Sequence, residues 1–158
     1  MGKWKLEIRQ SGPKDLLALL ELYKHLNPNE GQLEIEQAED TFAHFQSYSG
    51  SAIFLGRYEM KVVTSCTLIV VPNLTRNGAP YGLIENVVTD ASYRQRGFGK
   101  QILSAAVDAA WKCDCYKIML MTGSKRPETK KFYLDAGFEQ SKTGFQMRRI
   151  PVREDRPS

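Results

Sequence analysis

The spacing of apolar residues in the first third of the chain predicts one strand and two helices. A short strand is expected near residues 4–9, and Ser11-Gly12-Pro13 ends it because glycine and proline interrupt regular structure. A helix then begins close to Pro13, and four apolar side chains at helical intervals form its expected buried face: Leu16, Leu19, Leu20 and Tyr23. After a break at residues 26–31, a second and more polar helix is expected over residues 34–45.

The middle of the chain alternates apolar and polar residues in the way that is typical of strands. Two runs rich in β-branched and aromatic residues, 52–58 and 61–71, are separated by a tight turn near Glu59-Met60. Four apolar residues of the second run share the face that we expect to point inward: Val62, Cys66, Leu68 and Val70. A loop over residues 72–80 leads to a third strand over residues 81–89.

The longest helix is expected over residues 97–112. Six apolar residues there form one wide stripe: Ile102, Leu103, Ala106, Val107, Ala109 and Ala110. A strand over residues 116–121, a short helix from about 127 to 136, and strands near Phe138 and over residues 145–150 complete the chain. This order of elements predicts an α/β chain (mixed α+β sheet) with helices on the faces of the sheet.

Composition sets the class of protein. The chain has 158 residues, of which 42% are hydrophobic and 25% charged, and we expect a single domain over residues 1–152 with a frayed tail at 153–158. The apolar runs are strand-sized and the N-terminus has no apolar signal core, so we expect a cytoplasmic protein outside the membrane. Three cysteines and two distant histidines give neither a disulfide framework nor a zinc-ligand spacing, so no metal is predicted.

The net charge is +4, with a pI near 9.0. A basic balance can indicate nucleic acid as a partner, but the chain has no arginine-rich arm and no zinc finger. A small anionic cofactor would use the same charge, so no nucleic-acid partner is predicted.

The segment between the third of these strands and the long helix carries the clearest chemical signal. It reads Arg94-Gln95-Arg96-Gly97-Phe98-Gly99-Lys100. A helix start has unpaired backbone N–H groups and a partial positive charge, and Gly97 and Gly99 would let a phosphate approach these amides closely. Arg94, Arg96 and Lys100 add positive charge. The segment therefore predicts a cradle for a pyrophosphate, and a surface turn before an amphipathic helix is the alternative.

Two other phosphate-binding loops are excluded by spacing. A Walker A loop would have glycine where Arg94 stands and serine or threonine where Gln101 stands. A dinucleotide-binding fingerprint would have glycine or alanine in place of Ile102.

The loop resembles the Q/R-x-x-G-x-G/A signature of the GNAT superfamily of acetyl-CoA-dependent N-acetyltransferases, read here as Arg94-x-x-Gly97-x-Gly99. The stretch from Phe132 to Phe138, Phe-Tyr-Leu-Asp-Ala-Gly-Phe, is similar to the family's F-Y-x-x-x-G-F element. The resemblance implies a mostly antiparallel sheet that is splayed at its middle strands, with helices on both faces. It also implies an enzyme that moves the acetyl group of acetyl-CoA to a primary amine by direct attack in a ternary complex.

Catalytic roles can be assigned to two side chains. An alkyl amine is mostly protonated at neutral pH, so the reaction needs a general base, and Glu85 stands among apolar residues where burial could raise its pKa. The resemblance implies a glutamate in this strand that acts through water, while the alternative is that Glu85 faces solvent or pairs with an arginine. The resemblance further implies that the Tyr133 hydroxyl protonates the leaving thiolate, whereas a locally packed tyrosine is the alternative.

The resemblance also defines the cofactor site. A backbone N–H near Val87 or Val88 would polarise the thioester carbonyl where the sheet splays. The residues expected to bind acetyl-CoA are Val87, Val88, Arg94, Gln95, Arg96, Gly97, Phe98, Gly99 and Lys100.

The resemblance places acceptor specificity in residues 23–31 and 72–80, where Arg76 could meet a carboxylate or phosphate. Residues 83–88 and 115–118 look like the glucosamine-phosphate N-acetyltransferase branch, but that branch has an aspartate near residues 120–122 and this chain has Leu-Met-Thr. The acceptor is therefore left open, with a small-molecule amine as the first expectation. A protein or peptide acetyltransferase and a non-catalytic acyl-CoA-binding module are the alternatives, and a homodimer is compatible with the sequence.

Overall fold

The computed structural model describes residues 5–151, so the predicted tail at 153–158 lies outside the described residues. The chain divides into two units, one ending at Ser124 and the other beginning at Lys125. The single-domain organisation therefore stays a prediction, and the two units are described in turn.

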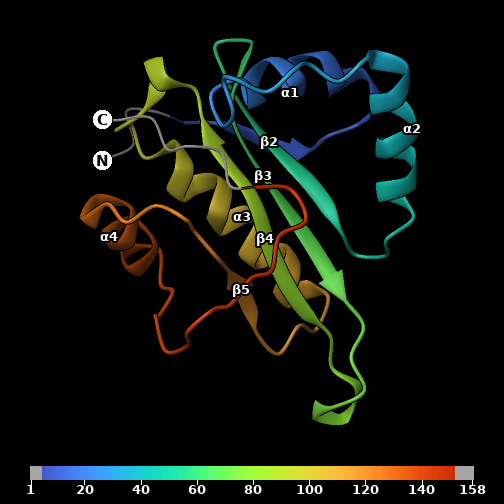
Figure 1. Ribbon diagram of the computed structural model, residues 1–158, viewed down its shortest axis with the longest axis vertical. Helices are drawn as coiled ribbons and strands as arrows, with labels where there is room; N and C mark the ends of the chain where they lie inside the picture. Colours follow the sequence, from blue (N-terminus) through green and yellow to red (C-terminus); the bar gives the residue numbers. More distant parts are fainter. Residues whose placement is uncertain (1–4, 152–158) are drawn as a thin grey trace. The chain divides into compact units, whose positions relative to one another are not determined.

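A five-stranded sheet forms the centre of the first unit, and its strands follow one another in chain order (Figure 1). The strands are β1 (Glu7–Gln10), β2 (Ala52–Tyr58), β3 (Lys61–Val71), β4 (Tyr81–Thr89) and β5 (Ile118–Leu120). Neighbours pair antiparallel except β5, which runs parallel to β4. A parallel neighbour requires a long crossover, which the helix between β4 and β5 provides. The mostly antiparallel sheet is confirmed.

Three helices accompany this sheet: α1 (Leu16–Tyr23), α2 (Ile35–Gln46) and α3 (Phe98–Lys112). Side chains of consecutive strand residues point to opposite faces. Cys66 of β3 reaches the backbone oxygen of Ile102 in α3, with Sγ at 3.6 Å, whereas Tyr23 of α1 lies near the hydroxyls of the flanking Ser65 and Thr67. Helices α1 and α3 therefore cover opposite faces, as predicted. Within residues 5–151, no helix combines the length and apolarity needed to cross a membrane.

The inward face predicted for β3 is wrong at Val62, which is half-buried, while the next residue, Val63, has 0% exposure. The reason is a β-bulge: Gly56 pairs with Thr64 but Arg57 pairs with Val62, so Val63 is the extra residue. A bulge changes which face the following side chains occupy. Val63 thereby packs with Leu6 and Phe98 in the core. In α1, Leu16 and Leu19 are buried as expected and Leu22 is buried in addition, while Leu20 and Tyr23 are half-buried.

The second unit contains α4 (Pro127–Asp135), as predicted. The strands predicted near Phe138 and over residues 145–150 are wrong, since the described part of this unit contains no strand. Alternating side chains give a strand tendency, but a strand needs a neighbouring backbone for its hydrogen bonds. No strand pairs with residues 138–150 in the described chain, and Phe145 and Met147 are 91% and 99% exposed.

Candidate active site

The predicted cradle begins where β4 ends. Asp90 leads into a single 3-10 turn over residues 91–93, and α3 begins at Phe98. Gly97 caps the helix with φ +79°, in the left-handed region that favours glycine. A Cβ atom at Gly97 would meet nothing within 4 Å, so the space above this residue is open to a ligand.

Backbone amides are the donors of this cradle. The Gln101 N–H bonds to the Gly97 carbonyl at 3.1 Å, so the amides of Phe98, Gly99 and Lys100 precede the first bond within the helix. The Phe98 side chain is 1% exposed and belongs to the core, so only its backbone can face a ligand. A phosphate at this helix start would meet donors and the positive end of the helix dipole.

The cations of the cradle differ in how they are held. Arg94 donates through Nε to the Thr89 carbonyl at 3.3 Å, and Arg96 donates to the Ser92 carbonyl at 3.3 Å. The Arg96 guanidinium also lies 4.9 Å from the centre of the Tyr93 ring. Gln95, with φ +61°, and Lys100 are exposed. Both arginines are thus held against the loop, where their charge adds to the helix start.

The edge of β4 beside this loop is not paired with β5 over more than half its length. β4 pairs with β5 only from Gly82 to Ile84, although β4 continues to Thr89. A bulge around Asn86, with φ +51°, shifts the register with β3 between Glu85 and Val88. Val87 and Val88, the predicted cofactor contacts, therefore lie on the stretch of β4 that is not paired with β5.

Glu85 is exposed, so the predicted apolar burial of this carboxylate is wrong, and the solvent-facing alternative describes its surroundings. Its register partner on β3 is Thr67, and directly paired residues point to the same face of a sheet. Thr67 points to the α1 side, near Tyr23. Glu85 is thus placed on the face opposite α3.

Tyr133 lies in the second unit, on α4. Its ring packs edge-on against the rings of Phe132 and Phe138, with centroids 5.0 and 6.2 Å away. Gly137, with φ +94°, ends the helix, and the Phe138 N–H donates to the Tyr133 carbonyl at 3.1 Å. The end of the helix thereby accounts for the glycine and the last phenylalanine of the F-Y-x-x-x-G-F element, and ring packing connects its three aromatic residues.

The β3–β4 loop, predicted to contribute to acceptor binding, lies at the opposite end of β4 from the cradle (Figure 1). The Asn73 amide donates to the carbonyls of Thr75 and Ala79, at 3.0 and 3.3 Å, and so holds the turn itself. The Arg76 guanidinium lies 5.6 Å from the centre of the Tyr116 ring. Local contacts therefore account for the polar side chains of Asn73 and Arg76.

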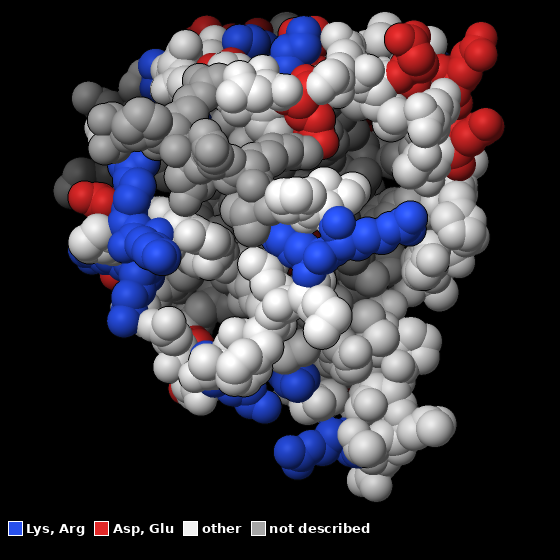
Figure 2. Space-filling model, viewed as in Figure 1, with Lys and Arg blue, Asp and Glu red and all other residues white. Residues whose placement is uncertain are grey.

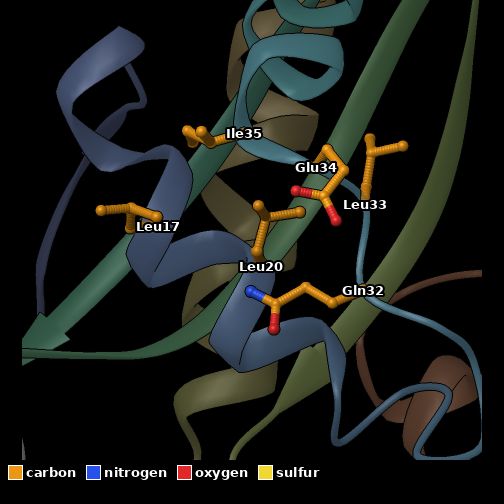
Figure 3. A pocket seen from close by; sticks show the side chains of 6 residues that line it. All are labelled: Leu17, Leu20, Gln32, Leu33, Glu34 and Ile35. Atoms are coloured by element: carbon orange, nitrogen blue, oxygen red, sulfur yellow. The ribbon is translucent and has the colours of Figure 1, made fainter.

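A cavity of about 300 Å³ lies between α1 and the segment that precedes α2 (Figure 3). Four of its six lining side chains are apolar, and the two polar ones come from the segment. Its lining residues are Leu17, Leu20, Gln32, Leu33, Glu34 and Ile35. The surface around α2 is acidic (Figure 2). Between Lys24 and Arg57 the chain has no lysine or arginine but five carboxylates: Glu30, Glu34, Glu36, Glu39 and Asp40.

Asp90, near the site, was missed by the sequence analysis, which expected Tyr23 to be buried but did not predict its contact with β3. Asp90 is a carboxylate with only 3% exposure, and Tyr23 has a hydroxyl whose pKa is raised by burial and partly lowered by Ser65 and Thr67. Asp90 stands two residues before Ser92, whose N–H it accepts at 2.9 Å, and an Asp-x-Ser sequence after a strand is a signal for such a turn. The helical spacing of Tyr23 predicted its burial, but nothing in the sequence indicates Ser65 and Thr67 as its neighbours.

Comparison with known proteins agrees with this geometry. Residues 18–138 match the model of the acetyltransferase (GNAT) family. A glucosamine 6-phosphate N-acetyltransferase of Trypanosoma brucei brucei is 31% identical over 133 residues, which cover 84% of this chain and 88% of that protein. Among solved structures, a putative acetyltransferase from Agrobacterium tumefaciens str. C58 is 44% identical, with a TM-score of 0.86 over 90% of this chain and 99% of that one. An acetyltransferase of Trypanosoma brucei is 27% identical, with a TM-score of 0.80 over 91% and 99%.

Proposed function

This chain belongs to the acetyltransferase (GNAT) family, and on that premise we propose that it moves the acetyl group of acetyl-CoA to the primary amine of a small molecule. The observation that carries the proposal is the cradle: a left-handed Gly97 with open space above it, at the start of a helix beside three cations. The pyrophosphate of acetyl-CoA would bind the amides of residues 98–100, with Arg94, Arg96 and Lys100 supplying charge.

The open edge of β4 is suited to the acetyl-bearing arm. Past Ile84 this edge is not paired with β5, so an extended amide-containing chain can bond to it as an added strand would. A backbone N–H at Val87 or Val88 would then donate to the thioester carbonyl oxygen, which gains negative charge when the amine attacks.

The proposed reaction is a direct transfer in a ternary complex. The amine nitrogen bonds to the carbonyl carbon, the carbon–sulfur bond breaks, and the thiolate leaves with a proton from Tyr133. Glu85 takes the proton of the amine through a water molecule. Its exposed position suits a water-mediated role, and it points to the sheet face opposite α3, so the acceptor would enter from the α1 side.

Charge on the α1 side bears on the acceptor. The relative from Trypanosoma brucei brucei is named for glucosamine 6-phosphate, an anion. Here the stretch between Lys24 and Arg57 has five carboxylates and no lysine or arginine, and within residues 5–151 none of Glu34, Glu36 and Glu39 forms an ion pair. A phosphate would be repelled there, so we propose an acceptor without a phosphate group.

Two measurements test the proposal in order. Titration calorimetry with CoA tests the cradle, and release of the CoA thiol from acetyl-CoA tests turnover with a panel of amines. The panel should contain glucosamine 6-phosphate, glucosamine, spermidine and a lysine-rich peptide. Binding with turnover of glucosamine or spermidine supports the proposal, and faster turnover of glucosamine 6-phosphate would overturn the acceptor class alone.

Other outcomes of these measurements would favour the alternatives. Turnover of the peptide only would identify a peptide acetyltransferase, and CoA binding without any turnover would identify an acyl-CoA-binding module. In an active enzyme, Glu85→Gln should reduce kcat at pH 7 and less so at pH 9.5, because more of the amine is then deprotonated without a base. An equal loss at both pH values would remove Glu85 from the role of base.

A further inference from the structure

We infer that Asp90 and His25 form a positioning pair, which ties the segment after α1 to the start of the cofactor cradle. The segment, residues 24–34, is called the linker segment below. Through this pair, a ligand that orders the cradle also orders the linker segment, which borders the cavity beside α1. The inference rests on the proposed function, because it assumes that CoA binds the cradle.

Asp90 is held from several elements at once. Lys61, at the start of β3, donates to Oδ2 at 2.7 Å, and the Ser92 N–H donates to Oδ1 at 2.9 Å. The backbone of Asp90 is fixed too, since its N–H donates to the Val63 carbonyl and its carbonyl accepts from the Tyr93 N–H, both at 2.9 Å. A buried carboxylate with these partners is tied to β3 and to the backbone of the turn at once, so it connects the entry of the cradle to the groups around it.

His25, which follows α1, contacts Asp90 and the residue after it. Its Nδ1 accepts the Ala91 N–H at 3.3 Å, and its Nε2 lies 3.6 Å from Asp90 Oδ2. Because Nδ1 is an acceptor, the neutral ring carries its proton on Nε2, facing the carboxylate. One imidazole therefore contacts two consecutive residues, 90 and 91, at which the 3-10 turn of the cradle begins.

The charge of Asp90 makes this contact electrostatic as well as steric. Burial by itself would raise the pKa of Asp90, but the hydrogen bonds from Lys61 and from the Ser92 N–H, together with the positive charge of Lys61, hold it below its usual value. Asp90 is thus an anion at neutral pH. Of the two side chains that lie against the buried carboxylate, that of His25 is less exposed, at 34%, than that of Lys61, at 57%.

The consequence is a coupling between the cofactor cradle and the linker segment, where the two substrates would bind. His25 lies directly after α1, where its own N–H bonds to the Leu22 carbonyl at 3.0 Å. A restraint on residues 90 and 91 is passed to His25 and from there to the linker segment. Such coupling is reciprocal, so acceptor binding beside the linker segment would also favour cofactor binding.

Hydrogen–deuterium exchange of the full chain, with CoA as the probe, tests the inference without knowledge of the acceptor. In the unaltered protein, CoA should slow exchange in peptides covering the cradle and in peptides covering the linker segment, by about fivefold or more in each. His25→Ala should keep the effect at the cradle and lose it at the linker segment. His25→Gln should restore it, because the glutamine amide can accept from Ala91 and donate to Asp90.

His44→Ala is the matched control, since His44 is exposed on α2 and packs edge-on against Tyr48, 5.5 Å between ring centres. This variant should behave like the unaltered protein. Two results would overturn the inference while leaving cofactor binding intact. The first is that CoA slows exchange only at the cradle in the unaltered protein. The second is that CoA still slows exchange at both the cradle and the linker segment in His25→Ala. If calorimetry shows no CoA binding, the proposed function is overturned as well. This result differs from both of the exchange patterns just described.

Discussion

Replacement of Gly97 by alanine separates the role of this residue in the backbone from its role in the cradle. Gly97 has φ +79°, where an alanine is strained by about 1–2 kcal/mol. Apart from the chain neighbours of Gly97, no atom of the described residues lies within 4 Å of the added Cβ, so the strain is the whole expected cost to folding. For a chain of this length, that cost corresponds to a fall in Tm of about 2–8 °C.

Gly78 provides a matched control on the β3–β4 loop. It has the same φ of +79° and, like Gly97, has no atom within 4 Å of an added Cβ. Gly78→Ala should therefore lower Tm by a similar amount. The two variants differ in that only the methyl group at residue 97 occupies the space in which a phosphate would approach the helix start.

Titration calorimetry with CoA measures the difference. Charge-assisted hydrogen bonds contribute about 1.5–3 kcal/mol each, so loss of one at the cradle should raise the Kd of Gly97→Ala by about 10- to 150-fold. Gly78→Ala should keep the Kd of the unaltered protein. Equal Kd values for the two variants would refute the argument that the cradle holds the pyrophosphate.

Three further predictions concern the acid, a buried thiol and Asp90. Tyr133→Phe should lower kcat by about 100-fold with little change in the KM for acetyl-CoA, and an unchanged kcat would remove the acid role. Burial raises the pKa of Cys66 to about 12, so a thiol reagent at pH 8 should label Cys113, which is half-buried, and leave Cys66 unlabelled in mass spectrometry of the folded protein. Rapid labelling of Cys66 would show that the core around it opens. The pKa of Asp90 is lowered in the folded state, so its charge stabilises the fold above the unfolded pKa of about 3.9, and this contribution is lost as pH falls through the folded pKa. Asp90→Asn should thus destabilise the protein in urea at pH 7 and progressively less below about pH 4, and a difference that is constant from pH 7 to pH 3 would contradict the reasoning.

The sequence by itself determined the helices, the three longest strands and the loop between β4 and α3. The strands at 52–58, 61–71 and 81–89 have the predicted bounds, and α3 starts one residue after the expected Gly97. These features depend on local spacing and on the conformational freedom of glycine. Residues that are neighbours along the chain are therefore enough to produce them.

Only the tertiary structure decided which residues meet. The bulge at Val63 brings that side chain into the core, and the pairing of Glu85 with Thr67 places the Glu85 carboxylate on the side opposite α3, where it is exposed. The contact of His25 with Asp90 joins residues 65 positions apart, and no spacing along the chain indicates it. Register, burial and charge pairing depend on the surfaces that strands and helices present to one another, and these surfaces exist only once the sheet has formed.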